Sequence, residues 1–181
     1  MNSELNNTTL AAAVAHSGKS SYAAKIGMSA GNSKAAFLAT ENDLAWAAGF
    51  LDGEACLSCV WQRYTLPNRR PTVRIRLSIT QNDLSVLEKL KDILDESCII
   101  QHTKRQRNHS RQVYVLSLDG IHALKAIIKV FPFLFRKKAE AKVLIESVKD
   151  CWFGVRPGKK GYPQHVWDAR SSLVEKLQNL K

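Results

Sequence analysis

Long apolar runs and an export signal are missing from this 181-residue sequence. No stretch reaches about 18 consecutive apolar residues, so we expect no membrane-spanning helix. The apolar run at residues 11–15 is too short for the core of a signal peptide, and it ends at His16 and Ser17. The four cysteines therefore predict reduced thiols in an intracellular protein, located in an organelle or in a prokaryotic cytoplasm.

Acidic residues are missing from two stretches, and this absence accounts for most of the net charge of +11. Residues 55–82 hold five arginines and residues 97–118 hold four basic residues, with no acid in either stretch. A face of one sign attracts a polyanion, whereas a solvated surface normally mixes both signs. Nucleic acid is therefore the favoured partner. An anionic membrane surface is the alternative, but these charges lie on strand-like segments and not on an amphipathic helix.

The hydrophobic content of 45% is typical of a globular protein, and the length suits one well-buried domain. Between residues 72 and 80, apolar residues alternate with Thr, Arg and Ser, which predicts a strand with one apolar and one polar face. Residues 55–64 are expected to pair with this strand. A second strand pair is expected at residues 98–105 and 111–118.

Helices are expected before, between and after these strands. Thr40, followed three residues later by Asp43, predicts a capped start for a helix over residues 41–53. Further helices are expected from Asn82 or Asp83 to about Glu96, from Asp119 or Gly120 to the break at Phe131-Pro132, over about 134–152, and near 167–180. Helices that bury the apolar sheet face leave the arginine-bearing face open, which predicts an α+β domain.

Three regions are expected along the chain. Residues 1–39 form an N-terminal arm, and residues 40–153 form the core. Residues 154–181 are expected to be a C-terminal loop and helix packed on the same domain.

The segment AAGFLDGEA, at residues 47–55, ends the first expected helix. Gly49 and Gly53 lie four residues apart on one helix face, where missing side chains allow another helix to approach closely. Ala45 and Ala48 extend this smooth face. The pattern favours packing of this helix against a second one.

Two acids stand at the C-terminal end of the same helix. Asp52 and Glu54 oppose the helix macrodipole, which suggests a bound cation or a cationic partner. If two copies pack through the glycines, their Glu54 carboxylates converge near one axis. Paired carboxylates bind hard cations such as Mg²⁺, which activate water for phosphodiester hydrolysis. A solvated helix end with a glycine cap is the alternative that these residues leave open.

These nine residues resemble the LAGLIDADG motif of homing endonucleases, which also occurs in forms such as LAGFLDGEG. Ala47 replaces the usual Leu at the first position, and Ala55 replaces the usual Gly at the last. The resemblance extends over residues 41–152 through the flanking strands and the order of helices and strands. It implies the αββαββα fold of this family, with a saddle-shaped antiparallel sheet and the motif helix at a dimer interface.

The resemblance also implies roles for single residues. Glu54 would coordinate the metal, and the carbonyl of Gly53 would help to hold the same ion. Asp52 would lie at the helix seam with a structural role. Gln81, at a strand end, matches the glutamine that contacts the water network of the site.

Residues 131–138 resemble the family's Pro-aromatic-Leu-x-x-Lys segment. Lys137 would then assist at the scissile phosphate, with Arg136 and Lys138 as rivals for that role. Because the chain has one motif, the resemblance implies a homodimer. Its expected interface residues are Ala45, Ala48, Gly49, Asp52 and Gly53.

The implied function is site-specific cleavage of double-stranded DNA by a homing endonuclease of intron or intein origin. The homodimer would recognise a long, roughly palindromic target and leave short 3′ overhangs. Mg²⁺ is the implied cofactor, with Mn²⁺ able to substitute and Ca²⁺ able to bind without supporting cleavage. Two alternatives within the same fold are an RNA-binding intron maturase and a DNA-binding protein that no longer cuts.

The polar phase of the expected strands supplies candidate DNA contacts. They are Ser58, Gln62, Tyr64, Arg69, Arg70, Thr72, Arg74, Arg76 and Ser78 from the first pair, and Thr103, Arg105, Arg107 and Arg111 from the second. Cys56 and Cys59 are spaced like a zinc-binding pair. Residues three apart on a strand point to opposite faces, however, which favours structural thiols.

Overall fold

The computed structural model describes residues 39–62, 72–94, 98–103, 112–153 and 161–181. The elements follow in the order α2 (Glu41–Glu54), β1 (Ala55–Gln62), β2 (Thr72–Gln81), α3 (Leu84–Leu94), β3 (Ile99–Thr103), β4 (Val113–Asp119), α4 (Ile121–Val130), a 3₁₀ turn η1 (Phe131–Phe133), α5 (Lys138–Glu146) and α6 (Gln164–Asn179). This is the α+β order expected from the sequence.

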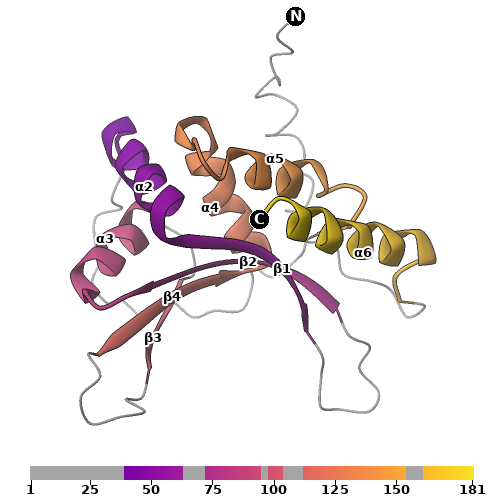
Figure 1. Ribbon diagram of the computed structural model, residues 1–181, viewed down its shortest axis with the longest axis horizontal. Coiled ribbons are helices and arrows are strands. Elements are labelled where there is room, and N and C mark those ends of the chain that lie inside the picture. Colours follow the sequence, from indigo (N-terminus) through magenta and orange to yellow (C-terminus); the bar gives the residue numbers. More distant parts are fainter. Residues whose placement is uncertain (1–38, 63–71, 95–97, 104–111, 154–160) are drawn as a thin grey trace, which may run out of the picture.

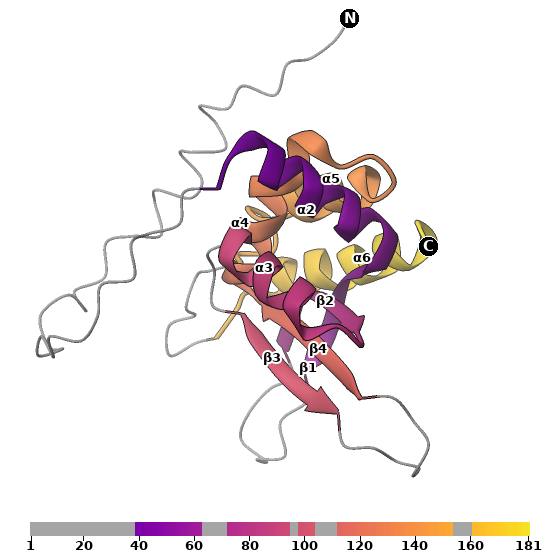
Figure 2. The ribbon, with the colours of Figure 1, turned by 90° about the vertical axis from the view of Figure 1, so that its left-hand side faces the viewer.

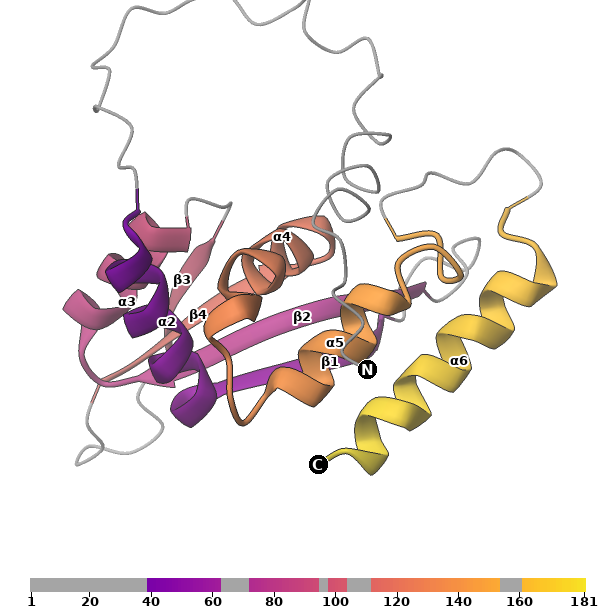
Figure 3. The same ribbon diagram turned by 90° about the horizontal axis from the view of Figure 1, so that it is seen from above.

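The four strands form one antiparallel sheet in the spatial order β1-β2-β4-β3. The sheet arches beneath the helices, and its lower, concave face carries no helix among the described residues (Figures 1 and 2). Seen from above, the helices lie across the other face, with α6 beside β1 (Figure 3). The expected saddle shape, with one covered and one open face, is confirmed.

Alternation along β2 divides the sheet into these two faces. Val73, Ile75, Leu77 and Ile79 are all buried, whereas the polar residues between them are half-buried. Ile75, Leu77 and Ile79 join side chains of the helices in a hydrophobic core. Removing this apolar surface from water is the main force that holds the helices on the upper face.

Helix α2 begins as the sequence predicts. The Thr40 side chain accepts a hydrogen bond from the Asp43 amide at 3.2 Å, and the Asp43 carboxylate accepts one from the Thr40 amide at 3.0 Å. This capping box satisfies amides that the helix itself leaves without partners. The helix ends where Ala55 takes an extended conformation and starts β1, so the motif leads directly into the sheet.

The helix expected over 134–152 is shorter in the structure. Leu134 is extended, and α5 starts only at Lys138 and ends at Glu146. The amides of Phe135 and Lys137 donate to the carboxylate of Asp52 on α2, which holds residues 135–137 outside the helix. A sequence pattern cannot report this contact because its partners are more than 80 positions apart.

None of the described helices combines the length and apolarity needed to cross a bilayer.

Replacing Leu77 by Ala should lower the free energy of unfolding by about 2–5 kcal/mol, because the side chain is fully buried and leaves a cavity between sheet and helices. Chemical denaturation monitored by circular dichroism measures this difference. Leu180→Ala makes the same chemical change at a side chain that is exposed, and it should leave stability nearly unaltered. Equal losses in the two variants would contradict the assignment of the core.

Candidate functional site

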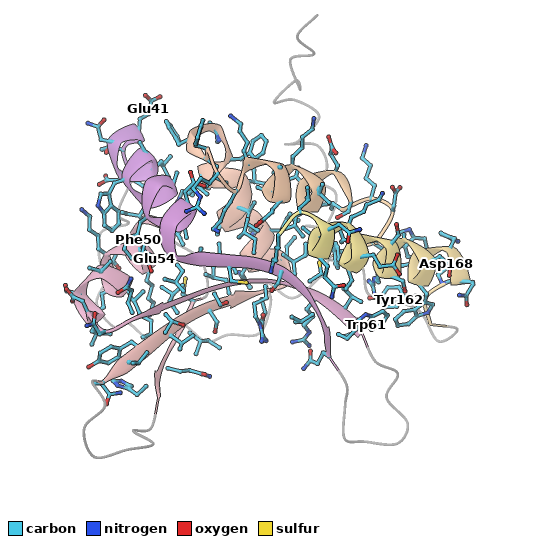
Figure 4. All side chains as sticks on the ribbon, viewed as in Figure 1. Glu41, Phe50, Glu54, Trp61, Tyr162 and Asp168 are labelled. Carbon is cyan, nitrogen blue, oxygen red and sulfur yellow. The ribbon has the colours of Figure 1, made fainter. Side chains whose placement is uncertain are left out.

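Glu54 is the last residue of α2 and lies exposed where the helix meets β1 (Figure 4). The last turn of α2 contains no basic residue that would balance its charge. Carbonyl groups in the final turn of a helix also lack intrahelical partners. The carbonyl of Gly53 and the carboxylate of Glu54 thus place oxygen atoms, the ligands preferred by hard cations, at one exposed point.

Asp52, two residues earlier, points into the protein and is only 8% exposed. Its Oδ2 accepts a hydrogen bond from the Phe135 amide at 2.7 Å, and its Oδ1 accepts one from the Lys137 amide at 2.9 Å. Burial alone would raise the pKa of Asp52. Hydrogen bonds from the amides of residues 135–137 and the charge of Lys137 outweigh burial and hold that pKa below its ordinary value.

The three expected catalytic residues come from distant parts of the chain but lie at one end of the sheet. Asp52 holds the Lys137 backbone beside the end of α2. Gln81 ends β2 two residues beyond Ile79, which pairs with Ala55, the residue after Glu54. The segments that carry Glu54, Gln81 and Lys137 therefore lie at the same end of the molecule.

The small residues of α2 divide between two faces. Ala45, Gly49 and Gly53 are exposed, and a Cβ atom added to either glycine would meet nothing within 4 Å. Ala48 and Asp52 instead pack inside the chain. The strip open to a second helix is thus formed by residues 45, 49 and 53, spaced four apart along the helix.

Two exposed aromatic side chains follow α4 near this strip. Phe133 ends η1, which packs against α2, and it is partly exposed. Phe135 is 87% exposed although it belongs to the segment bound by Asp52. Both apolar side chains are therefore exposed to solvent in the single chain.

The open face of the sheet carries the polar phase expected from the sequence. Ser58 faces Arg76, Gln62 faces Thr72, and Ser78 faces Ser117 across neighbouring strands. Arg74 lies on the same phase of β2 and is half-buried. The expected DNA contacts of the first strand pair that the structure describes therefore all lie on the open face of the sheet.

Arg76 has an acidic partner that the sequence analysis did not identify. Its Nε donates to Asp119 Oδ1 at 2.7 Å and its Nη2 donates to Asp119 Oδ2 at 3.0 Å. The hydrogen bond to Asp119 raises the pKa of Arg76. Asp119 is the first residue after the acid-free stretch at 97–118, and strand register brings it opposite Arg76. Part of the positive charge expected on this face is therefore neutralised.

Several expected DNA contacts lie outside the described residues. These are Tyr64, Arg69, Arg70, Arg105, Arg107 and Arg111. Thr103 ends β3, where it pairs with Val113, so its strand position is given.

The cysteines favour the structural interpretation. Cys56 is exposed, and Cys59 lies among side chains packed against the core. Burial, with a smaller contribution from Cys151, raises the pKa of Cys59 to about 12, so this thiol stays protonated. Within the described ranges, no three histidine, cysteine or acidic side chains gather as metal ligands would.

The arrangement combines an open, arched antiparallel sheet with a small-residue helix that ends in an exposed acid at the sheet edge. A family model described as LAGLIDADG endonuclease matches residues 47–146, more than half of the chain. The chain belongs to the LAGLIDADG endonuclease family. A search of curated proteins found no match.

Solved structures of homing endonucleases share the fold. I-CvuI in complex with the I-CreI target is 23% identical to this chain. The alignment covers 78% of this chain and 85% of the I-CvuI chain, with a TM-score of 0.58. The archaeal intron-encoded enzyme I-Vdi141I, complexed with DNA, is 18% identical. The alignment covers 77% of this chain and 84% of the I-Vdi141I chain, with a TM-score of 0.59. The group I intron-encoded I-CeuI, also complexed with DNA, is 18% identical. The alignment covers 78% of this chain and 68% of the I-CeuI chain, with a TM-score of 0.53.

Replacing Asp52 by Asn should lower the free energy of unfolding by about 1–3 kcal/mol near neutral pH, because two backbone amides lose a charged acceptor. The pKa of Asp52 is depressed by folding, so its contribution is complete above the unfolded value of about 3.9 and disappears as pH falls through the folded value. Urea denaturation at several pH values should show the gap between the proteins closing below about pH 4.

Glu54→Gln is the matched control, since it makes the same carboxylate-to-amide change two positions away on an exposed side chain. It should leave stability near that of the wild type. A gap for Asp52→Asn that stays constant down to acid pH would show that the charge of Asp52 is not what the amides require.

Proposed function

We propose that this protein is a metal-dependent, site-specific DNA endonuclease that cuts both strands as a homodimer. The observation that carries the proposal is the position of Glu54, an exposed acid where α2 meets an open sheet whose polar face bears Arg74 and Arg76. A protein that only bound DNA would gain nothing from a carboxylate beside phosphate groups. If the acid were buried, a structural role in the fold could explain it. Glu54, however, is exposed.

The sheet supports the DNA-binding part of the proposal through its shape and charge. Its concave face is free of helices among the described residues and is wide enough to offer side chains from several strands (Figure 1). Arg74 and Arg76 lie on this face, as do serine and threonine hydroxyls that can contact phosphates or base edges. I-CvuI, I-Vdi141I and I-CeuI were each solved in complex with DNA.

A divalent ion fits the oxygen atoms at the end of α2. Glu54 would hold it with its carboxylate and Gly53 with its main-chain carbonyl. Bound Mg²⁺ would activate water and stabilise the charge that develops on the leaving oxygen. Mn²⁺ would substitute, and Ca²⁺ would bind without supporting cleavage. Structures of I-CvuI with DNA were solved in the presence of Mg or Ca.

Two other side chains would act beside this carboxylate. Gln81, at the end of β2, would hydrogen-bond to water molecules of the site. The ammonium group of Lys137 would stabilise negative charge at the scissile phosphate, and Asp52 positions its main chain for this task. Asp52 itself is a positioning residue, since both of its oxygens are occupied by amides.

Dimerisation would supply the second carboxylate. The exposed strip at Ala45, Gly49 and Gly53 allows the close approach of an identical helix, and it runs toward Glu54. Phe135 would be covered in the same assembly. Two-fold symmetry would give two equal saddles and a long, roughly palindromic target. Cleavage on both strands would leave short 3′ overhangs at a site associated with an intron or intein.

Glu54→Gln should abolish cleavage while leaving DNA affinity within a few-fold of wild type, because the metal needs the carboxylate and the sheet does not. Gel assays on a target duplex with Mg²⁺ measure cleavage, and fluorescence anisotropy with Ca²⁺ measures binding. The substrate is the intron-less or intein-less allele of the host gene. The control variant is Asp168→Asn, which changes an exposed acid on α6. This variant should cut DNA at the normal rate. Cleavage by Glu54→Gln at the wild-type rate would place the catalytic acid elsewhere.

Gly49→Leu should convert the dimer into a folded monomer. The added side chain has open space in the single chain but would separate two helices that meet at this strip. Analytical ultracentrifugation, with and without DNA, measures the change in mass, and circular dichroism checks the fold.

Glu175→Leu adds the same side chain at an exposed position on α6 and should leave the dimer intact. If the wild type is a monomer even on its target, the dimer is wrong. If Gly49→Leu still dimerises, the interface lies on another surface.

A further inference from the structure

A second polar site lies in a cavity of about 330 Å³ beside the first half of β2. Its wall combines residues of the sheet with residues of the C-terminal region, among them Thr72, Arg74, Asp119, Gly120, Tyr162 and Arg170. Tyr162 lies at the opposite end of the molecule from Glu54 (Figure 4). This cavity is therefore separate from the site at the end of α2.

The cavity exists because β4 is shorter than β2 at this end. Pairing of the two strands starts at Arg76 and Asp119, so residues 72–75 of β2 have no partner on β4. Gly120 turns the chain away with φ 62°, while its amide donates to the Ile75 carbonyl at 2.7 Å. The helical layer thus has access to the open face of the sheet beside residues 72–75.

Arg170 of α6 uses this access. It is only 2% exposed, yet its Nη1 donates to the hydroxyl of Thr72 at 3.3 Å, on the polar phase of β2. Its Nε donates to the Cys151 carbonyl at 2.9 Å. The faces of Tyr162 and Trp167 surround the guanidinium, with centroids 4.0 Å and 5.6 Å from Cζ. Aromatic faces and neutral oxygens orient this charge without neutralising it.

No carboxylate of the described residues pairs with Arg170. Asp119 lines the same cavity, but its carboxylate is paired with Arg76 through both oxygens. Arg74 contributes a second guanidinium to the wall. The buried charge of Arg170 is unfavourable when no carboxylate of the described residues balances it, and an anion that enters the cavity would relieve this imbalance.

We propose that this cavity binds a phosphate group, held by Arg170 and Arg74 with the Thr72 hydroxyl, and that the natural source is a backbone phosphate in the outer part of the bound DNA. The identity of the source rests on the proposed DNA-binding function, whereas the preference for phosphate rests on the cavity alone. Thr72 and Arg74 belong to the polar phase of β2, so the wall of the cavity includes residues of the face on which the duplex would lie. Guanidinium groups suit phosphate because they offer paired donors.

Arg170→Met tests the site because it keeps an unbranched, buried side chain and removes the charge. In a Glu54→Gln background, we expect the slope of log affinity against log salt concentration to fall by about 0.9, the contribution of one phosphate contact. The loss should be equal on target and unrelated duplexes, since a phosphate carries no sequence information. Arg170→Lys should recover most of the slope. Lys176→Met removes a charge from the exposed face of the same helix and should change nothing.

Duplexes with one neutral methylphosphonate, placed at each position in turn, then identify the contact. One outer position should weaken binding of the wild type several-fold and have no further effect on Arg170→Met. Arg74→Met, at a half-buried side chain, repeats the test if Arg170→Met fails to fold. In a DNA-free arm, inorganic phosphate should raise the melting temperature, relative to chloride of equal ionic strength, more in the wild type than in Arg170→Met, because the general salt effect of phosphate acts on both proteins.

The two arms separate the two proposals. If the wild type binds DNA but both variants keep its salt slope and its response at every methylphosphonate, the cavity is not a phosphate site and the endonuclease proposal is untouched. If the wild type fails to bind duplex DNA but phosphate stabilises it through Arg170, the cavity binds a free phosphate and the proposed function fails.

Discussion

The carboxylate of Asp52 holds together the end of the protein at which the proposed site lies. It lies within the chain and accepts hydrogen bonds from the amides of Phe135 and Lys137, more than 80 residues away. This contact joins the last turn of α2 to the segment between η1 and α5. Without it, the amides of Phe135 and Lys137 would lose the acceptor that ties their segment to the end of α2. One buried acid therefore holds the Lys137 segment beside the helix end that carries Glu54.

The two acids of the motif show how burial separates their roles. Asp52 and Glu54 have similar chemistry and lie two residues apart, but α2 turns the first inward and leaves the second at its exposed end. Hydrogen bonds hold the pKa of Asp52 low despite burial, so it remains charged and tied to its partners. Glu54 stays open to an ion. The helical arrangement of residues around α2 also separates Ala48, which lies in the core, from the exposed strip at Gly49 and Gly53.

The arched sheet joins this site to a surface suited to a long, charged ligand. Helices cover its apolar face, and the other face displays arginine and hydroxyl side chains. Part of the positive charge on that face is paired with a negative charge, since Asp119 binds Arg76 in a bidentate contact. Arg170 adds a charge from the opposite layer, through the opening where β4 ends. The electrostatic surface is thus set by strand lengths and register as much as by composition.

The sequence by itself determined the elements and the motif, because their signals are local. Alternation in β2, the capping box at Thr40 and the nine residues ending at Ala55 each act over a few neighbouring positions, and the open face followed from the alternation. Tertiary structure alone decided the short α5, the Arg76–Asp119 pair, the inward direction of Ala48 and the access of Arg170 to Thr72. These features depend on which distant atoms meet after folding, and a pattern along the chain carries no distance in space.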